Sequence, residues 1–115
     1  MTEIAVSVMP VADVDAWHAF LDEISTGARS DAHRDFLRRG GVRTETVFHQ
    51  QTPMMVLVWD GVDPDQMAAH FASMLQNPTS DHERYLRDYV IPKVHGIDLT
   101  QPPPPPARQL AAIAT

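Results

Sequence analysis

The chain has no cysteine among its 115 residues. This absence excludes disulfide bonds, thiolate catalysis and every zinc or iron–sulfur site that depends on cysteine ligands. It also fits a cytoplasmic protein, which is the location we expect. Basic residues are scarce as well: the 9 lysines and arginines are outnumbered by 15 aspartates and glutamates, for a formal net charge of -6. Duplex nucleic acid and anionic membrane surfaces are therefore poor partners.

Long apolar runs and glycine-rich motifs are also missing. No apolar run approaches the ~20 residues that a membrane-spanning helix needs. The start, MTEIAVSVMP, lacks the basic and apolar regions of a signal peptide. There is no GxGxxG, no P-loop and no nucleophile elbow, so nucleotide cofactors are not indicated. With 43% hydrophobic and 21% charged residues, the sequence predicts an ordinary globular domain, for which we expect no cofactor and no metal centre.

Four short segments have the composition of β-strands, and two longer ones have helical periodicity. The predicted strands are residues 3–9, 42–50, 54–59 and 94–99. The predicted helical segments are residues 13–39, interrupted near Gly27, and residues 63–90, interrupted at Asn77 and Pro78, with Pro92 as a breaker. Their N-caps are predicted to be Asp13, Ser30, Asp63 and Ser80.

The order strand, helix, strand, strand, helix, strand predicts a ferredoxin-like βαββαβ fold of the α+β class. The sheet is expected to be antiparallel, with both helices on one face and the first and third strands in the middle. This domain takes residues 1–100. Residues 101–115 form a proline-rich tail that is either disordered or an arm crossing to a partner subunit.

The segment MMVLVW, residues 54–59, is apolar on both faces of its predicted strand. An antiparallel sheet covered by helices on one side usually has a wet second face. An apolar second face of this size marks an interaction surface. The simplest cover is a second copy of the chain, which predicts a two-fold homodimer packed sheet against sheet.

A βαββαβ chain of this length, with a sheet apolar on both sides, resembles the dimeric α+β barrel superfamily. That superfamily includes antibiotic-biosynthesis monooxygenases, haem-degrading monooxygenases, EthD-like proteins and stress-responsive barrel proteins. Within it, the segments GVRTETVF, VLVWDG and DPDQMAAHF resemble a group of short ferredoxin-like proteins, and the resemblance spans residues 3–99. It implies the dimeric barrel fold and a pocket for a small apolar molecule between sheet and helices. No catalytic block of the monooxygenases matches, so no catalytic residues follow from it.

Four residues are candidates for catalysis. Glu45 lies in the middle of a predicted strand, where a carboxylate is disfavoured. It either points inward as a general base or belongs to a solvated face and pairs with a basic residue on the next strand. His33 and His82 lie on the apolar stripes of their helices, either as hydrogen-bonded core residues or as acids that work with Glu45. With Tyr89 as a donor, the set suits isomerisation, cyclisation or dehydration of a carbonyl compound.

A further group is expected to bind substrate or line the pocket: Trp17, Arg43, His49, Trp59, Phe71 and Met74. For the two tryptophans, core packing is the competing interpretation. The predicted function is a small-molecule enzyme that acts on an apolar or aromatic carbonyl metabolite by cofactor-independent acid–base chemistry, or by oxygenation.

Two other functions remain open. One is a non-catalytic dimeric protein that binds a ligand or a partner. The other is a metal- or haem-binding barrel protein. For it, His33, Glu45 and His82 would form a two-histidine, one-carboxylate triad, or His33 or His70 would be an axial haem ligand.

Overall fold

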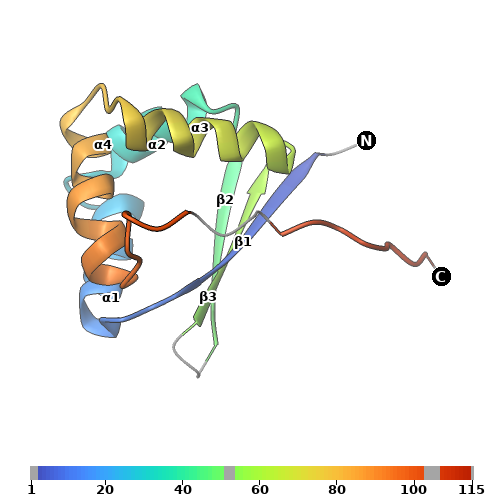
Figure 1. Ribbon diagram of the computed structural model, residues 1–115, viewed down its shortest axis with the longest axis horizontal. Helices are drawn as coiled ribbons and strands as arrows, with labels where there is room; N and C mark the ends of the chain where they lie inside the picture. Colours follow the sequence, from blue (N-terminus) through green and yellow to red (C-terminus); the bar gives the residue numbers. More distant parts are fainter. Residues whose placement is uncertain (1–2, 51–53, 103–106, 115) are drawn as a thin grey trace.

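The computed structural model describes residues 3–50, 54–102 and 107–114. These residues form, in chain order, β1 (Ile4–Pro10), α1 (Val14–Ser25), α2 (Ser30–Arg39), β2 (Thr44–Gln50), β3 (Met54–Asp60), α3 (Pro64–Gln76), α4 (Asp81–Tyr85) and the π-helical segment η1 (Leu86–Val94). The predicted α+β class is confirmed (Figure 1). None of the helices among the described residues has the length and apolar composition that crossing a bilayer requires.

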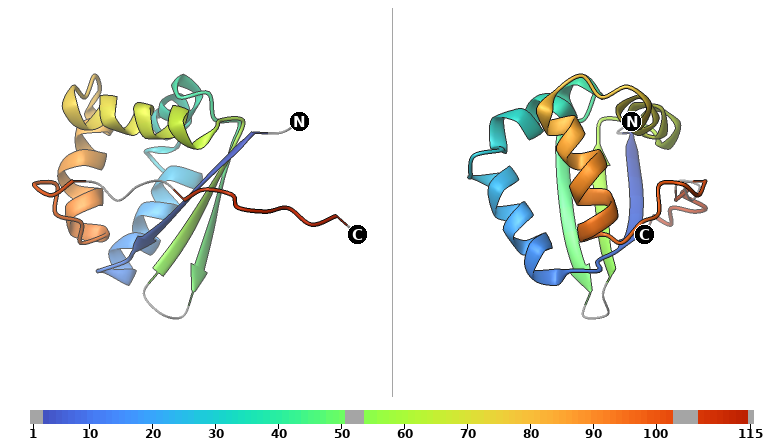
Figure 2. Two further views of the ribbon diagram at one scale, coloured as in Figure 1. Left: turned by 45° about the vertical axis from the view of Figure 1, so that its right-hand side comes forward. Right: turned by 60° about the vertical axis from the view of Figure 1, so that its left-hand side comes forward.

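Among the described residues, the sheet has three strands in the order β1-β3-β2, and both pairs are antiparallel. The helices lie on one side of it, and the other side carries no described helix (Figure 2). On the helix side, Met55, Leu57 and Trp59 of β3 are buried, whereas their neighbours along the strand are only partly covered. The register places Glu45 of β2 directly opposite Trp59, so the Glu45 side chain also faces the helices.

The predicted strand at residues 94–99 does not form, so the βαββαβ order is wrong and β1 is an edge strand instead of a central one. Pro92 does not end the helix either. Its ring displaces the carbonyl four residues earlier, and the backbone continues in a wider π turn, in which the His95 N–H donates to the Val90 carbonyl. The Val94 carbonyl then accepts the N–H groups of Ala12 and Asp13 at the start of α1. The Val94 backbone is therefore bonded to the start of a helix instead of pairing with a strand.

Three of the four predicted N-cap residues are confirmed. Asp13 and Asp63 accept backbone N–H groups of α1 and α3, and Ser80 does so for α4. Ser30 is not a cap: it is the first residue of α2, and its N–H donates to the Gly27 carbonyl. A tight turn at Gly27 thus joins α1 to α2. The Gly27 carbonyl accepts an N–H at the start of α2 in place of a side-chain cap.

Two predicted features lie outside the described residues: the hairpin connection around Pro53 and most of the proline run at residues 103–106. The tail that is described begins with Ala107, which forms an antiparallel bridge to Val6 on the open edge of β1. Beyond it, the chain leads away from the domain (Figure 1). Arg108 contacts Asp65 of α3 at 3.1 Å, but Leu110 and Ile113 are 96% and 89% exposed, so the tail makes little contact with its own domain beyond Arg108.

Gly40 lies at the end of α2. Its φ of −82° suits any residue, so the backbone does not require glycine there and the reason is the lack of space for a side chain. A Cβ built there would lie 2.5 Å from Cδ2 of His70. The His70 ring has little freedom to move, since its Nε2–H donates to the Phe36 carbonyl at 2.8 Å and the ring packs 4.5 Å from that of Phe36.

We therefore expect Gly40→Ala to lower the free energy of unfolding by about 1–2 kcal/mol, although alanine is the better helix former. Urea denaturation would measure this change. In a His70→Ala background the same substitution should be neutral or stabilising. An equal loss in both backgrounds would show that His70 is not the obstacle.

Candidate functional site

Four side chains from separate elements form one chain of hydrogen bonds. The Trp59 indole Nε1–H donates to Glu45 Oε2 at 2.7 Å, and Glu45 Oε1 lies 2.9 Å from His33 Nε2. His33 Nδ1 in turn lies 2.9 Å from His82 Nε2. His33, His82 and Trp59 are buried and Glu45 is nearly so, with 12% of its side chain exposed. The three predicted residues Glu45, His33 and His82 therefore converge.

The local structure explains why these side chains meet. His33 lies on the buried face of α2 beside Phe36, and His82 lies in the first turn of α4. An ion pair ties the two helices together: Arg39 of α2 contacts the buried carboxylate of Glu83 on α4 at 2.9 Å. The same carboxylate accepts the Thr79 N–H. The two histidines are thus held by contacts that do not involve either ring.

The protonation states follow from the partners. A carboxylate only accepts, so His33 donates Nε2–H to Glu45. If His33 is neutral, its Nδ1 accepts from His82 Nε2–H, and His82 Nδ1 is a bare lone pair. That atom is buried and has no hydrogen-bond partner among the described residues. Burial first, and then repulsion by His33 when that ring is protonated, lower the pKa of His82 from 6.5 to about 4, so the His82 ring is neutral near pH 7.

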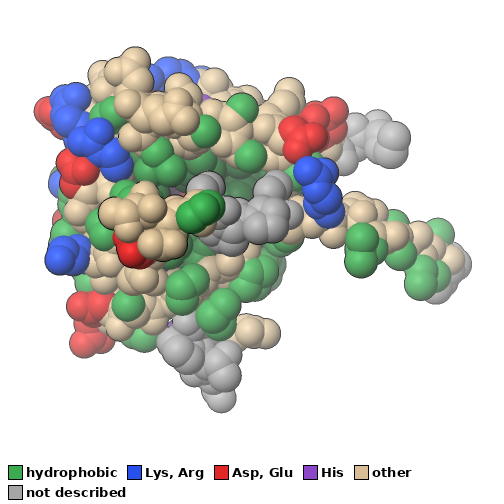
Figure 3. Space-filling model, viewed as in Figure 1, with side chains coloured by type: hydrophobic (Ala, Val, Ile, Leu, Met, Phe, Trp, Pro, Cys, Tyr) green, Lys and Arg blue, Asp and Glu red, His purple; other side chains and the backbone are tan. Residues whose placement is uncertain are grey.

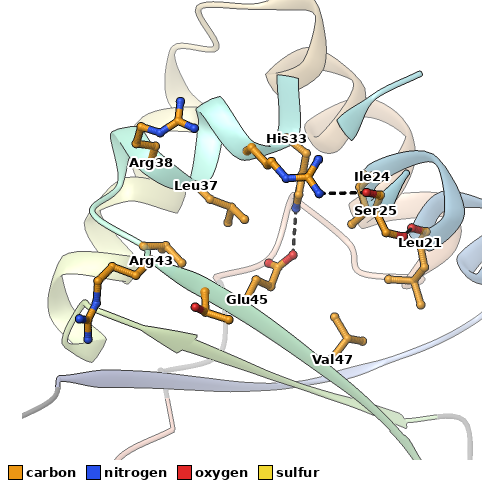
Figure 4. A pocket seen from close by; sticks show the side chains of 12 residues that line it. Leu21, Ile24, Ser25, His33, Leu37, Arg38, Arg43, Glu45 and Val47 are labelled. Carbon is orange, nitrogen blue, oxygen red and sulfur yellow. Dashed lines mark hydrogen bonds and ion pairs between the residues drawn. The ribbon is translucent and has the colours of Figure 1, made fainter. Parts of the chain in front are cut away.

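A cavity of about 570 Å³ opens between α1, α2 and β2, and both His33 and Glu45 line it (Figure 4). Its wall consists of Leu21, Ile24, Ser25, His33, Arg34, Leu37, Arg38, Val42, Arg43, Thr44, Glu45 and Val47. In Figure 4, Arg38 and Arg43 lie at one end, Leu21 and Val47 at the other, and the His33–Glu45 pair lies between them. The cavity thus has a basic end, an acid–base centre and an apolar end.

Tyr89, the fourth predicted catalytic residue, is not part of this chain. It is 40% exposed, and its ring stacks on that of Tyr85 at 5.2 Å. Burial raises the pKa of Tyr85, and the Arg29 guanidinium lies 3.4 Å from the centre of that ring. The two tyrosines form a surface stack along α4 and η1, and Tyr89 does not line the cavity. The prediction that it donates to the substrate is therefore not supported.

The predicted substrate-binding residues separate into three groups. Arg43 lines the cavity. Trp59 does not line it, but its indole N–H donates to Glu45, which does. Phe71 packs against the far side of Trp59, with ring centres 5.4 Å apart. The remaining three lie away from the cavity: Trp17 and Met74 are core residues, and the exposed His49 touches the edge of the Trp17 ring. For Trp17 the core interpretation is therefore the better one, and Met74 and Phe71 also pack in or against the core.

The metal and haem alternatives are not favoured by this geometry. His33 directs its two nitrogens at two different partners, so Glu45, His33 and His82 form a line and do not surround a common point. Within residues 3–50, 54–102 and 107–114, no group of three or more histidine or acidic side chains is placed to hold a metal ion. His70 uses Nε2 to donate to the Phe36 carbonyl.

Sequence reasoning missed Arg34 and Arg38, which line the cavity beside the predicted residues. A signal was present in SDAHRDFLRR: Arg34 and Arg38 are four residues apart, so they share one stripe of α2 that borders the stripe of His33 and Leu37. The helix dipole alone is enough to explain arginines near the C-terminal end of a helix, so their position in the sequence does not indicate that they also line a cavity.

The resemblance to the dimeric α+β barrel superfamily depends on the sequence pattern of residues 3–99. The structure has a helix-covered antiparallel sheet, but residues 94–99, which are described, do not form the fourth strand. Comparisons with protein-family models, with curated proteins and with solved structures find no match for this chain.

Proposed function

We propose that the protein is a small-molecule enzyme that moves a proton on a carbonyl compound without a cofactor. The observation that carries this proposal is the hydrogen-bonded chain Glu45–His33–His82 at the wall of a cavity large enough for a small metabolite. Polar networks of this kind, placed in a hollow and including a histidine with a strongly lowered pKa, are typical of acid–base sites.

The roles follow from position. Glu45 is the one carboxylate among the described residues that line the cavity, so it is the base. It takes a proton from the carbon beside the carbonyl, and the electron pair of that C–H bond moves onto the carbonyl oxygen as an enolate. The Arg34 guanidinium, also in the lining, supplies donors for that oxygen. Glu45 then returns the proton to the same carbon or to a conjugated one, which completes an exchange or an isomerisation.

Deuterium exchange tests this proposal without knowledge of the final product. The protein is incubated in D₂O with a panel of ketones and oxo acids that carry phenyl or alkyl bodies, including 4-phenylbutan-2-one and 4-phenyl-2-oxobutanoate. Loss of the ¹H signal beside the carbonyl is followed by NMR against a protein-free sample. Acceleration with any member supports the proposal, and no acceleration across the panel overturns it.

A second candidate is a ligand-binding protein without turnover. The observation that favours it is that both nitrogens of His33 and both oxygens of Glu45 already have protein partners, as in a purely structural network. Under this alternative the same compounds bind in the cavity, as shown by saturation-transfer NMR, and their C–H signals persist in D₂O.

We also propose that the chain forms a homodimer through the open face of its sheet. Direct strand partners share a face, so Val6, Val8, Phe48, Val56 and Val58 form one apolar surface. Val8 and Phe48 are 51% and 54% exposed, and Figure 3 shows hydrophobic side chains gathered over the strands below the tail. These five residues carry no charge, and Asp60 at the end of the same face is paired with Arg43. The chain's own tail contacts the β1 edge through Ala107 and α3 through the Arg108–Asp65 ion pair.

Light scattering after size exclusion should therefore give twice the monomer mass. Phe48→Glu should give the monomer, because it would place two carboxylates in an apolar interface. Ala69→Glu on the exposed side of α3 is the matched control and should remain dimeric. A monomeric wild-type protein at tens of micromolar would contradict the proposed interface.

A further inference from the structure

We infer that the ligand of this cavity is a small oxo acid, an anion whose carboxylate is held by Arg38 and whose apolar body faces Leu21 and Val47. The inference names the substrate class of the proposed enzyme and depends on the proposed function only for what happens to the bound molecule. The anion preference itself is argued from charge and geometry.

The charge around the cavity is opposite to that of the whole chain. The protein has 9 basic and 15 acidic residues. Three of the basic residues, Arg34, Arg38 and Arg43, line this one cavity, whereas Glu45 is the one acidic residue among the described lining. A concave surface lined mainly by positive charge focuses the field and attracts anions. In a protein that is acidic elsewhere, such a local excess of arginine selects for a negatively charged ligand.

The three arginines differ in how much of their hydrogen-bonding capacity is already used. Arg43 forms an ion pair with Asp60 at 3.0 Å, and Arg34 donates to the Ser25 carbonyl at 3.0 Å. Within the part of the chain that the structure describes, Arg38 forms no ion pair and no side-chain hydrogen bond. It also lies one helical turn from Arg34, an arrangement in which like charges repel. An anion at Arg38 would satisfy the free guanidinium and relieve that repulsion.

The order of groups along the cavity matches the order of groups in an oxo acid. Arg38 lies at one end, the His33–Glu45 pair in the middle, and Leu21 and Val47 at the far end (Figure 4). A carboxylate held at the Arg38 end would extend the rest of the molecule past the His33–Glu45 pair and over the apolar wall. A guanidinium is well suited to this task, because its planar fork binds a carboxylate with two parallel hydrogen bonds.

The test uses two probes with the same phenyl body and the same ketone: 4-phenyl-2-oxobutanoate, which carries the carboxylate, and 4-phenylbutan-2-one, which lacks it. Titration calorimetry gives the dissociation constant of each. The wild-type protein should bind the acid at least ~10-fold more tightly than the ketone, as expected for one charge-assisted pair. In Arg38→Gln this ratio should fall to about 1–3 with ketone affinity unchanged.

Arg87→Gln is the matched control. It removes the same charge from η1, where Arg87 contacts Asp88 outside the cavity, and it should retain the wild-type ratio. A ratio near one in the wild-type protein would overturn the inference. So would a ratio that survives Arg38→Gln, since a role limited to the C-terminus of α2 would change stability and not selectivity. Selective acid binding without deuterium exchange would retain the anion site and reject the enzyme, so the two failures are distinguishable.

Discussion

Replacing Glu45 by glutamine is expected to slow deuterium exchange of the accepted carbonyl compound by about 10²–10⁴-fold, the usual contribution of a general base. Glutamine has nearly the shape of glutamate but no basic oxygen pair. Exchange is the correct readout, because it reports proton abstraction itself. Any later step, such as isomerisation or release, is left out of the measurement.

The fold should survive this change because the network can rearrange. The glutamine carbonyl would accept the Trp59 indole N–H, as Glu45 Oε2 does at 2.7 Å. The amide NH₂ would then face His33 Nε2 and require it to accept. His33 must move its proton to Nδ1 and donate to His82 Nε2, which leaves the buried His82 Nδ1 protonated. Neither ring gains or loses a proton in this rearrangement, and the cost is a change of tautomer in both rings.

That rearrangement has its own signature. In Glu45→Gln the protonated nitrogen of the His33 ring should change from Nε2 to Nδ1, and that of His82 from Nε2 to Nδ1. The ¹⁵N chemical shifts of the two nitrogens in each ring should therefore be reversed. Glu23→Gln is the control, since it makes the same change at an exposed carboxylate that pairs with Arg29. Exchange that persists at the wild-type rate in Glu45→Gln would show that another group is the base. Loss of exchange without a tautomer shift would contradict the assigned hydrogen bonds.

Three of the four predicted strands and the burial of His33 and His82 were predictable from the sequence, because both depend on periodicity, whereas the convergence of these rings with Glu45 was left open. The short apolar run MMVLVW identifies β3, and the two-residue repeat of a strand assigns its side chains to two faces. Glu45 is a carboxylate in the middle of β2, where a charged side chain is disfavoured, and the helical spacing of His33 and His82 places each ring on a buried stripe. Residues that break a local rule often mark functional positions.

What the sequence did not reveal depends on contacts between distant segments. Nothing local in residues 86–99 distinguishes a helix that ends at Pro92 from one that widens into a π turn. The outcome is decided by the Val94 carbonyl, which accepts N–H groups from the start of α1. The basic end of the cavity is also a tertiary feature, since Arg38 and Arg43 come from different elements. Tyr89 was predicted to lie in the site but does not, for the same reason: helical spacing does not show which neighbouring element covers a ring.

The second large effect is expected from pH, through His82. Its pKa in the folded protein is about 4, lowered mainly by burial, against 6.5 for an unperturbed histidine. Between these values the unfolded chain binds a proton that the folded protein does not, so the free energy of unfolding falls as the pH falls. The loss begins near pH 6.5, ends near pH 4 and amounts to about 3 kcal/mol for this one ring.

His82→Gln should remove this part of the pH dependence. A glutamine amide can still face His33, and it does not titrate. Urea denaturation of both proteins from pH 7 to pH 4 should show a variant profile that is flatter by up to about 3 kcal/mol. Some slope should remain, because burial also lowers the pKa of His95, whose ring bonds to the Pro10 carbonyl.

The double variant His82→Gln/His95→Gln should be flatter still, since the two rings lie in separate networks and their effects should add. Parallel profiles for the wild type and His82→Gln would mean that the His82 ring accepts its proton as readily in the folded protein as in the unfolded chain. The chain Glu45–His33–His82 would then end in a solvated histidine, and the assignment of His82 as the neutral, buried end of the site would be wrong.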